Sequence, residues 1–264
     1  MDDKKNSRFI PGIYNYCDRW CERCAFTHRC RNFSMREDDG LSHEERSEKN
    51  DAFWQQLERA SEASMDEWKD SAEDEGSGIS PDMEFTEEEL EEAERDSERR
   101  EAKAKELGGP VTQSAEAYTW KLRQFIEAHR ELFRTPPDEI DPAVITAAGG
   151  DTNAEADSVW LQDAVEVINW HQFFITVKLM RAFHSLVTEE EFPHDWPRDS
   201  DGTAKVALIG LDRSIAAWVV VRDMLPVYRE EAVDFVGRLK RLSAKVEAQF
   251  PNARAFVRPG FDER

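Results

Sequence analysis

The hydrophobic pattern of the C-terminal part of the chain is helical. Four segments repeat apolar side chains at intervals of three and four residues, the period of an amphipathic α-helix. They are residues 112–134, 158–188, 203–225 and 228–250. The loops between them contain helix breakers such as Pro136-Pro137, Gly149-Gly150, Pro193 and Pro197. No segment alternates apolar and polar residues as a strand would. The pattern predicts an all-α fold in which residues 111–264 form a bundle of about four helices.

The second of these segments is apolar nearly all round, so we expect it to be the central helix. One face carries Glu166, Arg181 and His184 at helical steps, with aromatic residues between them. Asp212 lies in a mostly apolar stretch of the next helix, and a buried carboxylate needs a partner, for which we expect Arg181 or Lys178. Two interpretations stay open. The four residues Glu166, Arg181, His184 and Asp212 form either a buried network that fixes helix register or an acid–base site of an enzyme.

Residues 37–110 form an acidic region that we predict to be a largely helical arm or linker. Ser42 and Glu45 have capping-box spacing before a first helical pattern, and Thr86 and Glu89 have it before a second. The second pattern has almost no apolar face, and we expect Gly108-Gly109-Pro110 to end it. This region is either a solvated linker or an acidic docking surface for a basic protein partner.

The charge of the chain is unevenly distributed. Of a net charge of −21, residues 37–107 contribute −18, from 27 acidic and 9 basic side chains, whereas residues 1–36 have a net charge of +4. A strongly acidic chain repels a polyanion, so the charge argues against a nucleic-acid partner.

The longest apolar run does not resemble a membrane span. It extends from Val206 to Leu225, and Asp212 and Arg213 interrupt it. The N-terminal residues lack the apolar core of a secretion signal. We therefore expect a cytoplasmic protein without a membrane partner, and the sequence does not indicate its oligomeric state.

All four cysteines of the chain lie within fourteen consecutive residues, in a module that we assign to residues 1–36. They are Cys17, Cys21, Cys24 and Cys30, with the spacing C-x3-C-x2-C-x5-C. Disulfides between such close neighbours would require a contorted loop, and cytosolic thiols stay reduced. Four thiolates complete a tetrahedral ligand set for a soft or borderline metal, so the spacing predicts a metal site.

Two metals fit four thiolates, and the compact spacing favours an iron–sulfur cluster. Structural zinc sites pair a C-x2-C turn with two ligands on a more distant segment, whereas a cubane cluster is large enough for one short loop to reach its corners. Cys17-x3-Cys21-x2-Cys24 resembles the cluster motif of radical S-adenosylmethionine enzymes. Cys21-x2-Cys24-x5-Cys30 is similar to the last three ligands of the iron–sulfur loop in DNA glycosylases. The chain has neither the βα barrel of the first family nor the helix-hairpin-helix of the second, so the resemblances imply a [4Fe–4S] cluster without either activity.

The sequence therefore predicts a metal-cluster protein with a structural or redox role exercised through a protein partner. An enzyme with an acid–base site in the bundle and a zinc-stapled interaction module are the alternatives. The C-terminal stretch from Phe250 to Phe261 mixes aromatic residues and arginines, and we expect it to fold back against the bundle or the cysteine module.

Overall fold

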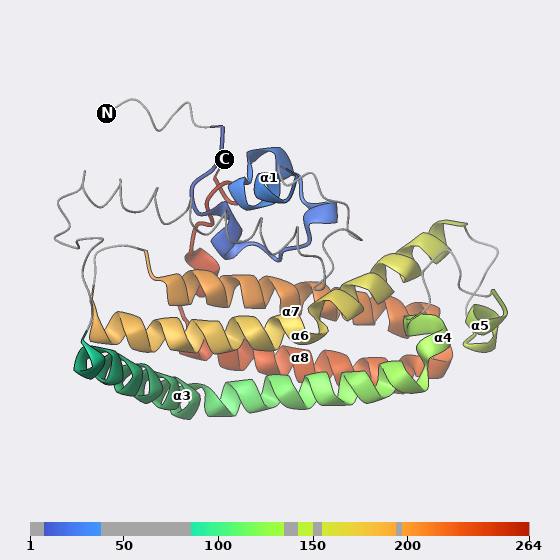
Figure 1. The fold of residues 1–264 in the computed structure, drawn as a ribbon. Helices are drawn as coiled ribbons and strands as arrows, with labels where there is room; N and C mark the ends of the chain where they lie inside the picture. Colours follow the sequence, from blue (N-terminus) through green and yellow to red (C-terminus); the bar gives the residue numbers. More distant parts are fainter. Residues whose placement is uncertain (1–7, 38–85, 135–141, 150–154, 194–196, 264) are drawn as a thin grey trace. The chain divides into compact units, whose positions relative to one another are not determined.

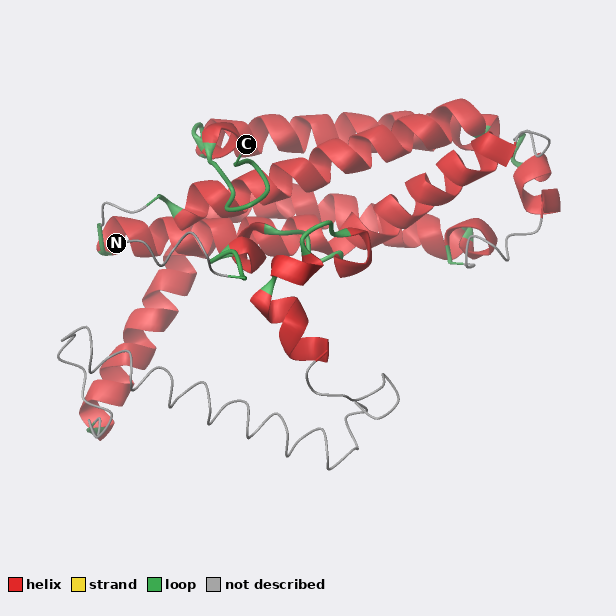
Figure 2. Ribbon diagram, turned by 90° about the horizontal axis from the view of Figure 1, so that it is seen from above, coloured by secondary structure: helices red, strands yellow, loops and turns green. Residues whose placement is uncertain are grey.

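The computed structural model of the chain describes residues 8–37, 86–134, 142–149, 155–193 and 197–263 (Figure 1). Within these ranges every regular element is an α-helix or a 3-10 helix, and none is a strand (Figure 2). The predicted all-α class is confirmed. The first helical pattern of the acidic region, after Ser42, lies outside the described residues. No described helix has the length and apolar character needed to cross a membrane.

The described residues belong to two compact units. The first contains residues 8–14, 19–37 and 86–97, and the second contains residues 15–18 and the chain from Glu98 onward. Three short elements of the first unit surround its cysteines: η3 (Cys21–Arg23), η4 (Thr27–Arg29) and α1 (Arg31–Glu37). The division at residues 36 and 110 that the sequence suggested stays a prediction.

The second unit is the predicted helical bundle. Its long helices are the part of α3 (Glu87–Ala128) from Glu98 onward, α6 (Glu155–Glu191), α7 (Asp199–Met224) and α8 (Arg229–Gln249), with the short helices α4 (Arg130–Phe133) and α5 (Pro142–Ala147). In Figure 1, α6, α7 and α8 run side by side, and α7 packs against both of the others.

Aromatic side chains form much of the bundle core. The indole of Trp218 is fully buried and stacks on Phe235 with ring centroids 4.3 Å apart. Phe125 approaches the same indole edge-on at 5.6 Å, and the indole N–H donates a hydrogen bond to the hydroxyl of Tyr118 (3.3 Å). Each polar atom of these aromatic residues thus has a partner inside the core, as buried polar atoms require.

The prediction that residues 158–188 form the central helix is wrong. Helix α7 has packed neighbours on two sides, whereas α6 exposes several large apolar side chains. Phe173 is 49% exposed, Val177 60% and Met180 54%. A helix with apolar residues on all sides can therefore leave one of its apolar faces at the protein surface. Apolar atoms make up a large part of the surface of most folded proteins.

The prediction that Gly108-Gly109-Pro110 ends a helix is also wrong, because α3 continues through all three residues. A Cβ added at Gly108 would lie 2.7 Å from the ring of Phe183 on α6, so glycine allows the two helices to approach closely. Earlier in α3, the side chain of Arg99 pairs with Glu191 of α6 at 2.6 Å. These tertiary contacts outweigh the helix-breaking tendency of Gly-Gly-Pro.

Two further local predictions are confirmed. The capping box at the start of α3 is formed, with the Thr86 N–H donating to the Glu89 carboxylate (2.8 Å) and the Glu89 N–H donating to the Thr86 hydroxyl (3.3 Å). The C-terminal stretch folds back on the bundle, where Ala253 is fully buried and Asp262 pairs with Lys205 of α7 at 2.8 Å.

Candidate metal-binding loop and the residues around Cys17

Three of the four cysteines lie in the first unit, at the ends of short 3-10 turns. The backbone N–H of Cys24 donates to the carbonyl of Cys21 (3.1 Å), which closes η3. The N–H of Cys30 donates in the same way to Thr27 (3.1 Å) and closes η4. Turns of this kind bring residues three apart close together, which explains how a C-x2-C pair can serve one metal.

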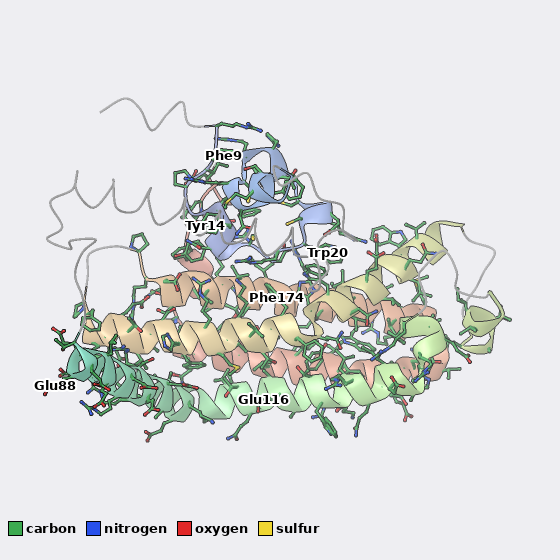
Figure 3. The ribbon with its side chains drawn as sticks, in the orientation of Figure 1. Phe9, Tyr14, Trp20, Glu88, Glu116 and Phe174 are labelled. Carbon is green, nitrogen blue, oxygen red and sulfur yellow. The ribbon has the colours of Figure 1, made fainter. Side chains whose placement is uncertain are left out.

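The sulfur of Cys24 accepts a hydrogen bond from the backbone. The N–H of Phe26 points at Cys24 Sγ with a donor–acceptor distance of 3.4 Å. Hydrogen bonds from the backbone to cysteine sulfur help to tune the potential of iron–sulfur clusters. The guanidinium of Arg23 lies 4.5 Å from the ring centre of Trp20, one of the loop aromatics labelled in Figure 3. The described loop thus has an amide donor and cationic side chains in the sequence positions next to its thiols.

Arg19, between Cys17 and Cys21, has an unusual backbone conformation. Its φ angle is 58°, in the left-handed region that non-glycine residues seldom adopt. Such a conformation costs about 1–3 kcal/mol and persists only where surrounding interactions require it. The chain therefore turns at a strained point between the first two cysteines.

The four thiols are outside disulfides, but they do not form a finished ligand set. None is in a disulfide, and each is half-buried. Across the described ranges, no group of three or more His, Cys, Asp or Glu side chains is positioned to hold a metal ion. The donor chemistry fits a metal, whereas the metal site itself stays a prediction from the sequence.

Cys17 belongs to the second unit, and the bundle holds the residue on its N-terminal side. The hydroxyl of Tyr16 hydrogen-bonds to Asp199 at the start of α7, and its ring packs on Phe256 with centroids 4.8 Å apart. The backbone at Gly202 approaches the same ring so closely that an added Cβ would lie 2.5 Å from it. Burial, followed by the charge of Asp199, raises the pKa of the Tyr16 hydroxyl, so Tyr16 stays protonated and donates.

The bundle also holds the residue on the C-terminal side of Cys17. The carboxylate of Asp18 pairs with Arg213 of α7, and the backbone carbonyl of Asp18 accepts a hydrogen bond from the indole N–H of Trp170 on α6 (3.1 Å). We call this set of contacts the Cys17 clamp. It consists of Tyr16 and Asp18 with their partners Asp199, Gly202, Phe256, Trp170 and Arg213.

The clamp could not be predicted from the sequence. Its members are far apart in the chain, and none stands out by motif or spacing. Asp199 also accepts hydrogen bonds from Arg181 (2.9 Å) and Ser185 (2.7 Å). Burial raises the pKa of Asp199, but the hydrogen bonds from Ser185 and Tyr16 and the charge of Arg181 outweigh it, so the pKa lies below its usual range.

The four polar residues proposed as an acid–base site have separate surroundings. The expected pairing of Asp212 with Arg181 or Lys178 is wrong, because Asp212 is exposed and pairs with Arg254, while Arg181 pairs with Asp199. Asp212 faces water because the core-facing side of α7 lies elsewhere on the helix. His184 is exposed, and Glu166 is half-buried. A catalytic role for Glu166, Arg181, His184 and Asp212 stays a prediction.

Comparison with known proteins gives no family for this chain. No protein-family model matches it, and neither a curated protein nor a solved structure matches it significantly. The function is therefore inferred from the residues themselves.

Proposed function

We propose that this chain binds a metal centre through Cys17, Cys21, Cys24 and Cys30. The observation that carries the proposal is that all four cysteines lie within fourteen consecutive residues and that none of them is in a disulfide. The closed turns at Cys21–Cys24 and before Cys30, and the amide that points at Cys24 Sγ, support it. Metal binding and folding are commonly coupled. The four cysteines would then come together as a ligand set only when the metal binds.

Of the two candidate metals, we propose a [4Fe–4S] cluster over zinc. The support is the single short wrap of ligands, which suits the size of a cubane. Nearby arginines would offset the negative charge of either all-thiolate site and do not distinguish the two metals. When bound, the cluster would supply one-electron transfer or a structural cross-link, whereas zinc would supply the cross-link alone. Cysteines stay outside disulfides in the reducing cytoplasm, which is the compartment we propose.

The role we propose is structural or redox, exercised through a protein partner that docks on the acidic region. The first turns of α3, from Glu87 to Arg95, are exposed and mostly acidic. A basic protein surface complements this charge, and a nucleic acid does not. We do not extend the proposal to acid–base catalysis, because Arg181 and Asp212 each have another partner.

The test is metal retention after single cysteine substitutions. Cys21→Ser, Cys24→Ser and Cys30→Ser are each expected to lower bound metal severalfold, while the helix content measured by circular dichroism is unchanged. His28→Ala is the matched control, because His28 is the one histidine of the described loop and is exposed. Equal metal content in the wild type and in all three cysteine variants would contradict the proposal.

A further inference from the structure

We propose that the helical bundle positions the Cys17 sulfur for metal binding through the Cys17 clamp, so that metal affinity and bundle stability are thermodynamically linked. The inference rests on the metal centre proposed above and assigns a positioning role to residues of α6, α7 and the C-terminal segment. All contacts of the clamp lie inside the second unit, to which residues 15–18 belong.

The ring of Tyr16 has a fitted place on the bundle. A Cβ at position 202 would lie 2.5 Å from one ring carbon of Tyr16 and 2.7 Å from a ring carbon of Phe256. Carbon atoms do not approach so closely, so the position of the Tyr16 ring requires glycine at 202. Asp199, one turn earlier on the same helix, accepts a hydrogen bond from the Tyr16 hydroxyl and so fixes the far end of the ring.

Asp18 is held by both its backbone and its side chain. The indole N–H of Trp170 donates to the Asp18 carbonyl at 3.1 Å, and Arg213 pairs with the Asp18 carboxylate. Because Cys17 lies between two anchored residues, its backbone cannot move far without breaking one of these contacts. The bundle therefore fixes the position of the Cys17 backbone, and with it the region that the Cys17 sulfur can reach before metal binds.

A metal ligand that is already held in place loses less conformational freedom on binding than a ligand on a free chain. The clamp should therefore raise metal affinity. By reciprocity, bound metal should raise the free energy of unfolding of the bundle by the same amount that the clamp adds to metal binding, because one coupling free energy governs both equilibria.

The experiment titrates Co²⁺, whose thiolate charge-transfer absorption reports on cysteine ligation, into the reduced, metal-free full chain under anaerobic conditions. Gly202→Ala is expected to weaken Co²⁺ binding by at least about fivefold. Gly108→Ala is the matched control, because its added Cβ also meets an aromatic ring, that of Phe183 at 2.7 Å, but lies outside the clamp. This control should destabilise the bundle and leave Co²⁺ affinity within about twofold of the wild type.

A double-mutant cycle separates positioning from general destabilisation. In a Cys17→Ser chain, Gly202→Ala should have no further effect on Co²⁺ affinity, because the positioned ligand is already absent. If Gly202→Ala does not fold, Arg213→Gln replaces it and should weaken binding about twofold to fivefold. Asp212→Asn is its control, because the neighbouring Asp212 pairs with Arg254 rather than with the clamp.

The outcomes distinguish this inference from the proposed function. Wild-type affinity in both Gly202→Ala and Arg213→Gln, or an equal loss in Gly108→Ala, would overturn the positioning role and leave the metal centre intact. A wild-type chain without a thiolate–Co²⁺ band would overturn the positioning role, and it would overturn the metal centre as well if the chain as isolated holds neither iron nor zinc. A selective loss in the clamp variants, absent in the Cys17→Ser chain, is the predicted result.

Discussion

The helical bundle and the cysteine loop differ in what holds them in place. The bundle has a continuous apolar core in which large side chains such as Trp218, Tyr118 and Phe235 are almost completely buried. In residues 8–37, by contrast, Ile13 is the only large apolar side chain that is buried, and the local structure consists of short turns. Segments this small generally need a metal, a disulfide or another cross-link, and none of the four cysteines is in a disulfide. The bundle can therefore fold on its apolar core, whereas we propose that the loop depends on a metal bound by its thiols.

The largest expected effect comes from removing the metal, because this should unfold the cysteine loop and leave the helical bundle folded. After chelation, we expect backbone amides of residues 19–33 to lose protection from hydrogen exchange almost completely, while amides of α7 and α8 stay protected. Hydrogen exchange followed by mass spectrometry, with and without chelator, measures both regions in one sample. Equal protection of the loop in the two samples would show that it does not depend on a metal.

Truncating a core side chain should instead destabilise the helical bundle. Trp218→Ala removes a fully buried indole and is expected to lower the free energy of unfolding by about 3–5 kcal/mol, measured by urea denaturation. Trp120, which is 62% exposed on α3, provides the control, and Trp120→Ala should change stability by less than about 0.5 kcal/mol. Similar losses in the two variants would contradict the core described here.

The paired glycines of α3 test the close approach of α3 and α6. Gly108→Ala should destabilise the bundle by about 1–3 kcal/mol, because its Cβ would meet the Phe183 ring at 2.7 Å. Gly109→Ala should stabilise it by about 0.5–1 kcal/mol, because the nearest atom to its Cβ is the end of the Gln113 side chain at 3.9 Å and alanine favours a helix. Thermal or urea unfolding of the two variants gives opposite signs if the packing is as described.

The smallest expected effect is a pH dependence inside the bundle. Burial lowers the pKa of His171, although its hydrogen bond with the Val167 carbonyl (2.9 Å) acts in the opposite direction. An unfolded histidine has a pKa of about 6.5, so below that pH the unfolded chain takes up a proton that the folded chain does not. The free energy of unfolding should therefore fall as the pH decreases below about 6.5.

His171→Leu should reduce the slope of stability against pH in this window, as measured by urea denaturation at several pH values. His184→Leu is the control, because His184 is exposed on the same helix, and it should leave the slope in place. A slope unchanged by His171→Leu would assign the pH dependence to other groups.

Local patterns in the sequence predicted much of the fold. Helices α6, α7 and α8 lie within a few residues of the segments expected from hydrophobic period, and the capping box at Thr86 is formed as predicted. The continuation of α3 through Gly108 could not be predicted, because its cause is the Phe183 ring on another helix. Local pattern likewise does not specify which helix is central.

The candidate site was predictable only in part. The close spacing of the cysteines identifies candidate ligands, but the anchoring of Cys17 depends on Tyr16 meeting Asp199 and on Asp18 meeting Arg213, which are remote in sequence. The partners of Arg181 and Asp212 were mispredicted for the same reason. Which charges pair depends on how neighbouring helices are turned and on where the C-terminal segment folds back.

The most direct test of the account is the metal content of the wild-type chain purified without oxygen. Iron, acid-labile sulfide and zinc are measured per chain, and the visible spectrum is recorded on the same sample. The account predicts a brown protein with about four iron and four sulfide per chain, as a [4Fe–4S] cluster requires. A colourless protein with one zinc would overturn the cluster and keep the four-cysteine site. A chain that holds none of these metals would contradict the central claim.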